Sequence, residues 1–132
     1  MQKKFTPLLS LTLVLVLIFT ACATSVQPDV APGDTVLVSI DGSAADDFDM
    51  ILSAQPIALE PGDSAFDLLL RTGVDVAYST STFGVFVTSI GGLEGGNNSG
   101  WMFYVNGEQP TVGSDSHTPG PGDEIVWLFM EF

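Results

Sequence analysis

Cys22 is the only cysteine in this chain of 132 residues, so the fold has no intramolecular disulfide and depends on a hydrophobic core. The cysteine ends a patterned N-terminal segment. Lys3 and Lys4 come first, an apolar run of about a dozen residues follows, and the small residues Thr20 and Ala21 precede the cysteine. This order is typical of a secretory signal and its processing site. Residues 1–21 are therefore predicted to be a signal peptide that is removed from the mature protein.

Residues 19–22, Phe-Thr-Ala-Cys, resemble the lipobox of bacterial lipoproteins. The resemblance implies that Cys22 is lipidated and becomes the first residue of the mature chain, anchored to the cell membrane outside the cytoplasm. Two alternatives stay open. An uncleaved transmembrane anchor needs about 20 apolar residues, and Ser10 and Thr12 shorten this run. A plain secretory signal cut elsewhere would leave Cys22 as a free thiol.

The mature chain is expected to be strongly acidic. Residues 1–21 contain both lysines and no acidic residue, so their removal takes the formal charge from −13 to −15 and leaves Arg71 as the only basic side chain against 16 acidic ones. Such a surface repels phosphate groups, so nucleic acid is excluded as a partner. Residues 22–33 are small, polar and proline-bearing, and are predicted to be the lipidated N-terminus and a linker. Residues 34–132 are predicted to form one domain, which we expect to be a monomer.

Hydrophobic patterns predict an α+β domain in which a mixed sheet of about five strands is crossed by one short helix. The final strand is apolar on both faces, so we expect it in the middle of the sheet, beside the first strand. The helix is expected after Pro61-Gly62-Asp63, with a capping box at residues 64–67 and Gly73 at its end. Residues 79–82 are expected to be a connection, and residues 91–100 a flexible loop. Strands are expected at residues 35–40, 50–59, 83–90, 101–105 and 124–132.

The second half of the chain resembles a known family. Residues 83–90, residues 100–107 (Gly-Trp-Met-Phe-Tyr-Val-Asn-Gly) and residues 122–127 are similar to the C-terminal domain of transcobalamin and intrinsic factor, and more closely to its stand-alone bacterial relatives of unknown function. The resemblance covers roughly residues 35–132 and implies a β-grasp-like fold. It also makes cobalamin or a related corrinoid a candidate ligand. The animal carriers hold the other face of cobalamin with a helical barrel, which we do not expect in this chain.

Two interpretations of residues 101–105 stay open. Trp101, Phe103 and Val105 share one face of the expected strand, and Met102 and Tyr104 share the other. The first interpretation is that one face is core and the other is half-exposed. The second is that Met102, Tyr104 and the glycine-rich loop form an apolar platform for a ligand. The candidate ligand-binding residues are Thr88, Ser89, Asn97, Asn98, Trp101, Met102 and Tyr104.

No catalytic or metal-ligating constellation stands out in the sequence. His117 lies beside Asp115 and Ser116, but the groups of a catalytic triad converge from a rigid scaffold, so we expect an exposed loop histidine. The acidic loop at residues 41–49 could offer oxygens to a cation, although it lacks the ligand spacing of an EF-hand. We therefore expect that the protein is not an enzyme and that it holds no resident cofactor or metal.

These observations favour a non-catalytic, lipid-anchored binding module for a corrinoid-like small molecule. The alternative is a surface domain for protein–protein interaction or adhesion, which uses sheet edges and binds no small ligand. An apolar aromatic site would favour the first function, and an unpaired edge strand without a pocket would favour the second.

Overall fold

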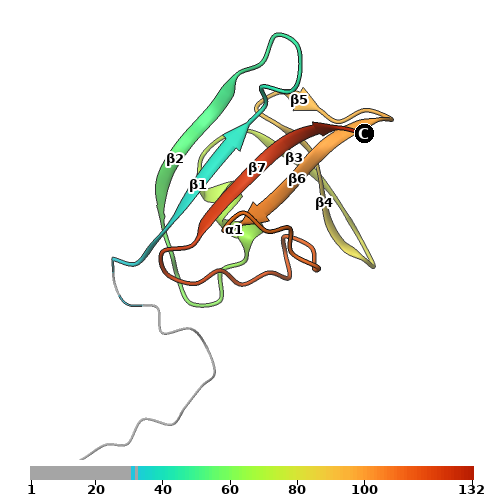
Figure 1. The fold of residues 1–132 in the computed structure, drawn as a ribbon. Helices are drawn as coiled ribbons and strands as arrows, with labels where there is room; N and C mark the ends of the chain where they lie inside the picture. Colours follow the sequence, from blue (N-terminus) through green and yellow to red (C-terminus); the bar gives the residue numbers. More distant parts are fainter. Residues whose placement is uncertain (1–30, 32) are drawn as a thin grey trace, which may run out of the picture.

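A computed structural model describes residue 31 and residues 33–132 of the chain (Figure 1). The predicted signal peptide, the lipidation site at Cys22 and most of the predicted linker lie outside these residues. Two sheets and one short helix make up the described part, so the α+β class is confirmed. No helix within it is long and apolar enough to span a membrane.

Sheet A has four strands in the order β2-β1-β7-β6. Its strands are β1 (Thr35–Asp41), β2 (Met50–Ala58), β6 (Ser99–Val105) and β7 (Glu124–Glu131). Sheet B has three strands in the order β3-β4-β5. Its strands are β3 (Val76–Ser81), β4 (Gly84–Ile90) and β5 (Leu93–Glu94), and the helix α1 (Ala65–Arg71) precedes them in the chain.

The last strand lies in the interior of sheet A, between β1 and β6, as its two apolar faces predicted. It pairs in parallel with β1, where Val38 lies opposite Ile125 and Ile40 lies opposite Trp127. Its other edge pairs antiparallel with β6. The expected position of the final strand beside the first is confirmed.

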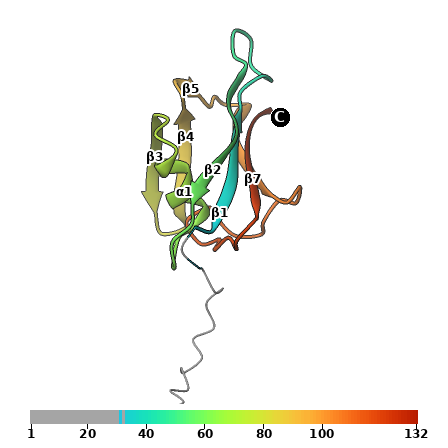
Figure 2. The ribbon, with the colours of Figure 1, turned by 90° about the vertical axis from the view of Figure 1, so that its left-hand side faces the viewer.

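The core lies between two layers, which Figure 2 shows edge-on. Sheet A forms one layer, and α1 together with sheet B forms the other. Alternation along β1 places Val36, Val38 and Ile40 on the inner face, where all three are fully buried. The inner side chains of β7 and the buried stripe of α1 complete the cluster. These other core residues include Ala65, Phe66, Leu68, Leu69, Ile125, Trp127 and Phe129.

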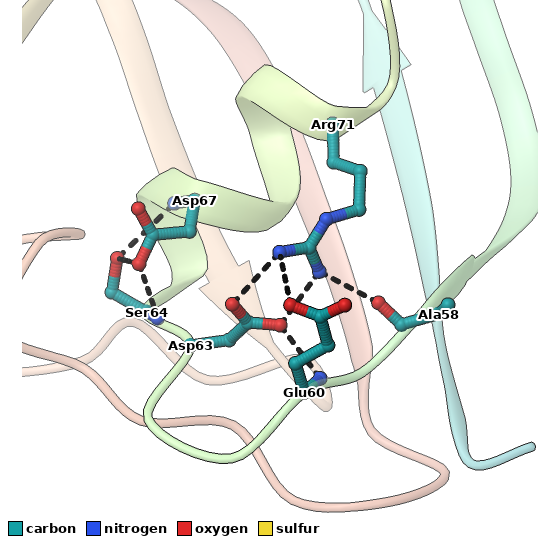
Figure 3. A network of polar contacts seen from close by, with 6 residues as sticks. All are labelled: Ala58, Glu60, Asp63, Ser64, Asp67 and Arg71. Atoms are coloured by element: carbon teal, nitrogen blue, oxygen red, sulfur yellow. Dashed lines mark hydrogen bonds and ion pairs between the residues drawn. The ribbon is translucent and has the colours of Figure 1, made fainter. Parts of the chain in front are cut away.

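The helix begins at the capping box that the sequence predicted. The Ser64 hydroxyl accepts a hydrogen bond from the Asp67 amide at 3.1 Å, and the Asp67 carboxylate accepts one from the Ser64 amide at 2.9 Å. The amides of Ser64 and Asp67 are thereby satisfied (Figure 3). Gly73 follows the helix with a φ of 80°, the left-handed conformation that glycine adopts without steric cost.

Arg71, in the last turn of α1, holds the helix to the end of β2 (Figure 3). Its guanidinium donates two hydrogen bonds to the Asp63 carboxylate, at 2.6 and 2.9 Å, and a third to the Ala58 carbonyl at 2.7 Å. Hydrogen bonding from Arg71 holds the pKa of the buried Asp63 carboxyl below its usual value, and the same pair raises the pKa of Arg71. Glu60, which is exposed, lies 3.6 Å from the guanidinium.

The strand count and the single sheet differ from the expectation. Residues 79–82 were expected to be a connection, but most of them belong to β3, which forms an antiparallel hairpin with β4. Apart from the half-buried Val76, every residue of β3 is exposed, so the strand carries no alternating apolar pattern. Within the expected glycine-rich loop, Leu93 and Glu94 form the short strand β5. The β-grasp assignment stays a prediction.

We predict that Arg71→Gln lowers the free energy of unfolding by about 2 kcal/mol, because it leaves the buried Asp63 carboxylate without its charge partner. The folded-state pKa of Asp63 is depressed, so the pair stabilises the protein above the unfolded-state pKa, about 4. This stabilisation is lost as the pH falls through the folded-state pKa. Urea denaturation between neutral and acidic pH should show the difference between the two proteins shrinking as the pH falls.

Glu60→Gln is the matched control, since Glu60 is an exposed partner of the same guanidinium. Its effect on stability should stay within about 0.5 kcal/mol. If Arg71→Gln and Glu60→Gln had equal effects, the pair with Asp63 would not be what holds the helix.

Candidate functional site

Two strand edges that are paired over only part of their length lie near each other where sheets A and B meet. β6 is the last strand of sheet A. The edge of β4 that faces β5 is paired only at Ser89 and Ile90, so residues 84–88 have no strand partner there within the described residues. A cleft of about 210 Å³ lies between these edges and is bordered by the loop between β6 and β7. We call it the β4–β6 cleft. It is lined by Val85, Phe86, Val87, Trp101, Met102, Phe103, Gln109, Pro110, Val112, Gly113, Ser114 and Trp127.

Aromatic rings from β6 and β7 form much of the cleft wall. Phe103 lies opposite Trp127 in the antiparallel pairing, and the two rings stack with centroids 5.3 Å apart. Two residues earlier on β6, Trp101 lies opposite Phe129, and the two rings pack edge to face with centroids 5.4 Å apart. Such cross-strand aromatic pairs fix ring positions as well as adding buried apolar area. The wall is therefore rigid and apolar.

The two tryptophans differ in their hydrogen bonding. The Trp101 indole N–H donates to the Leu93 carbonyl at 2.8 Å, which ties β6 to β5. The Trp127 indole nitrogen is also buried, but it has no hydrogen-bond partner among the described residues. A buried N–H donor without an acceptor is uncommon in native structures. The buried Trp127 N–H is therefore left without a partner, and so is the buried Nε2 atom of His117.

Large apolar side chains are exposed around the same cleft. Phe86, on β4, is 63% exposed, and Val112, in the loop between β6 and β7, is 48% exposed; both line the cleft. Phe83, in the turn between β3 and β4, is 98% exposed. Single exposed apolar residues are common, but Phe86 and Val112 line a hollow, as side chains at binding surfaces do. No charged side chain is among the lining residues.

The structure separates the predicted ligand-binding residues. Trp101 and Met102 line the β4–β6 cleft. Thr88 lines a smaller neighbouring hollow of about 130 Å³ with Phe86 and Val87. Ser89 is half-buried and pairs with Glu94. Asn97 and Asn98 are exposed in the turn that precedes β6, where the Asn98 carbonyl accepts a hydrogen bond from the Phe132 amide at 2.7 Å.

Tyr104 does not line the cleft. It is half-buried, and its hydroxyl donates to the Met130 sulfur at 3.3 Å. Trp101 and Val105 are buried, so the face of β6 that they share is the core face. The predicted platform of Met102, Tyr104 and the glycine-rich loop is thus not one surface.

Sequence reasoning missed most of the cleft wall. Val85 and Phe86 were placed on a strand without a role, and Trp127 and Val112 were not candidates. One signal was available for Phe86, because alternation places it on the opposite face of β4 from Val85 and Val87, so at most one of these two apolar sets had to lie in the core. The loop residues carried no such signal.

His117 and the acidic loop do not form evident sites. His117 is half-buried rather than exposed, because its carbonyl accepts the Ala65 amide at 2.9 Å and its ring lies 6.2 Å from Phe103. Asp115 and Ser116 are exposed beside it. A hydrogen bond from Ser43 lowers the pKa of Asp41. Nowhere in residues 33–132 do three or more His, Cys, Asp or Glu side chains gather as a metal site would require.

Comparison with known proteins shows which family the chain belongs to. The family described as a domain of unknown function, DUF4430, matches residues 62–131, from the turn before α1 to the end of β7. The chain belongs to this family. None of the curated proteins matches it in sequence.

Two crystal structures are similar to this DUF4430 protein in fold. One is a protein from Ruminococcus gnavus ATCC 29149 with a suggested metal-binding role, with a TM-score of 0.58 and 14% identity over 75% of this chain and 98% of that one. The other is haptocorrin in complex with Cbi, with a TM-score of 0.61 and 14% identity over 75% of this chain. This chain spans only 25% of haptocorrin. At this identity the likeness shows the fold alone, and it confirms the transcobalamin-like fold that the sequence motifs implied.

We predict that Phe86→Ser leaves the free energy of unfolding within about 0.5 kcal/mol of the wild type, because most of this ring is in water. Trp127→Ala should instead cost about 3 to 5 kcal/mol, since it opens a void beside Phe103. Chemical denaturation followed by circular dichroism measures both. A large loss of stability in Phe86→Ser would mean that this ring belongs to the core and not to a free cleft wall.

Proposed function

We propose that this DUF4430 protein is a non-catalytic binding module of β-grasp type whose ligand places an uncharged group in the β4–β6 cleft. The observation that carries the proposal is the cleft itself, an aromatic-walled hollow without charged lining between the partly paired edges of β4 and β6. An apolar pocket with a few polar groups is the usual form of a small-molecule site.

The volume limits the group that enters. A cavity of about 150 Å³ accepts a benzene molecule, so a cleft of about 210 Å³ suits a single ring or a short side group. The charge of the protein also limits which ligand group can bind. Arg71 is the only Lys or Arg among the described residues, and it is already bound to Asp63. An anionic ligand would meet a uniformly acidic protein. A neutral group fits best.

A corrinoid is the first ligand to test, because haptocorrin has a similar fold and was solved with Cbi. The cleft would take one peripheral group of a corrinoid, not the whole macrocycle, which is far larger than the hollow. The ring system would then lie over Phe86 and Val112 at the entrance.

We predict that cobalamin and cobinamide quench the tryptophan fluorescence of the full chain in detergent micelles in a saturable way at micromolar concentration. The chain has only two tryptophans, Trp101 and Trp127, and both line the cleft, so a corrin bound there lies close to both. A free-tryptophan titration corrects for absorption by the ligand. Val112→Asp places a charge at the entrance and should weaken binding at least tenfold.

Met50→Asp is the matched control. Met50 is 51% exposed, about as much as Val112, and lies on β2, at the opposite edge of sheet A from β6. The Met50→Asp variant should bind corrinoids with the same affinity as the wild type. If the wild type shows no quenching beyond the free-tryptophan control at millimolar ligand, a corrinoid is not the ligand.

The second candidate is a protein–protein interaction or adhesion domain, favoured by the exposed Phe83 and the unpaired part of β4. An extended segment of a partner could add to this edge as a further strand. Absence of corrinoid quenching, together with photo-crosslinking of an envelope protein through a reactive group at position 83, would favour this function.

We further propose that the module is a lipoprotein anchored outside the cytoplasm through Cys22. Its support is the sequence alone, since Cys22 lies outside the described residues. Anchoring near the bilayer would suit a protein that captures a ligand at the cell surface.

We predict that cells expressing the wild type incorporate an alkyne-labelled palmitate into the protein and that Cys22→Ser abolishes the label and releases the protein from the membrane fraction. Cys22 is the only thiol, so no other cysteine can take the lipid. Ser25→Ala, which changes a hydroxyl outside the lipobox, should be labelled normally. Membrane retention of an unlabelled Cys22→Ser protein would instead indicate an uncleaved anchor.

A further inference from the structure

The strand β7 presents apolar side chains on both faces of sheet A, although only one of these faces packs into the core. Its inward side chains are buried, and the alternate residues on the opposite face are half-buried. Strand pairing with β6 and alternation along β1 add one apolar residue of each of these strands to that opposite face. We call this surface the outer face of sheet A. It is formed by Leu37, Tyr104, Val126, Leu128 and Met130.

No helix or strand of the described residues covers the outer face. Figure 2 shows α1 and sheet B on the other side of sheet A. None of the five side chains belongs to the core cluster or to the partly buried side chains that pack against it. Two of them, Tyr104 and Met130, instead contact each other. A sheet face in contact with water normally carries polar side chains, so an apolar one indicates a surface that a partner covers.

One end of the outer face has an acidic rim. A hollow of about 320 Å³ lies there, and Leu128 and Met130 line it together with the carboxylates of Asp41 and Glu131. Hydrogen bonding from Ser43 holds the pKa of Asp41 below its usual value, so this carboxylate is charged at neutral pH. The apolar hollow is therefore bordered by negative charge.

The opposite end of the outer face is acidic as well. Glu124, the first residue of β7, is exposed and lies opposite Leu37. No positive charge balances these carboxylates, because Arg71 is the only Lys or Arg among the described residues. It belongs to α1, in the other layer, and is hydrogen-bonded to Asp63. The outer face is thus an apolar patch between two negative ends.

The charge of the outer face selects among its candidate occupants. A second copy of the chain or an anionic lipid surface would bring negative groups against the negative ends and be repelled. A partner with cationic groups around an apolar centre matches both parts of the face. We infer that the outer face of sheet A docks another protein through an apolar patch flanked by Lys or Arg. None of its five residues lines the β4–β6 cleft, so this surface does not depend on the ligand proposed there.

Short synthetic peptides can supply the chemistry of such a partner. The fluorescent probe has alternating leucine and threonine in its centre and lysines at both ends. One control peptide has glutamates in place of the lysines, and the other has serines in place of the leucines. The full chain is held in phosphatidylcholine nanodiscs, which carry no net charge, and empty nanodiscs give the background. By fluorescence anisotropy, the lysine-flanked probe should bind about tenfold more tightly than either control, because each control lacks one of the two matches.

Leu128→Gln and Leu70→Gln make the same change in the two layers. Leu70 lies on α1 and is 41% exposed, so it is the matched control. Leu128→Gln should weaken binding of the lysine-flanked probe about fivefold, since it removes apolar contact area from the outer face, and Leu70→Gln should leave it unchanged. Tryptophan emission reports whether each variant is folded. Equal losses in the two variants, or no loss in a folded Leu128→Gln protein, would overturn the docking surface.

A photoreactive group at position 128 identifies the occupant without relying on a loss of binding. After illumination in the same nanodiscs, the full chain should form an adduct with the lysine-flanked peptide and none with the glutamate-flanked one. An adduct with a second copy of the chain or with phospholipid, and none with the peptide, would show that the partner is not a cationic protein surface. Equal labelling of the two peptides would also contradict the inferred charge of the partner.

Discussion

The parallel pairing of β1 with β7 is the contact on which the rest of the structure depends. It joins the first and last strands in the middle of sheet A, so the buried faces of both strands form one continuous side of the core. Because β7 occupies that position, β6 becomes the edge of the sheet, and Trp127 is carried to the wall of the cleft. The core and the candidate site therefore share one strand, and a change in the register of β7 would disturb both.

An unpaired strand edge is a hazard, since it can pair with other chains. Here the described part of the chain carries one guanidinium and a large excess of carboxylates, and this charge opposes self-association. The cleft between β4 and β6 has no such charge in its lining. The acidic surface thus keeps copies of the protein apart. The uncharged lining of the β4–β6 cleft is compatible with an uncharged ligand group.

Elements with a strong local signal could be predicted from the sequence. The capping box at Ser64 and the final strand, apolar on both faces, led to correct elements. β3 could not be predicted, because its side chains are mostly exposed and its strand conformation comes from pairing with β4. The alternation of side chains along β6 predicted that Trp101 lies on the opposite face from Met102 and Tyr104. It could not show which of these two faces packs into the core. The cleft combines residues of the three strands β4, β6 and β7 with loop residues distant in sequence, a proximity that no local pattern encodes.

The pairing of β1 with β7 also sets the order of events during synthesis. β1 leaves the ribosome long before its parallel partner exists, and contacts between such distant segments form slowly because a long loop must close first. Until β7 has been made, the inner faces of β1 and α1 have no complete layer to cover them. The complete core can therefore form only after nearly the whole domain has been synthesised.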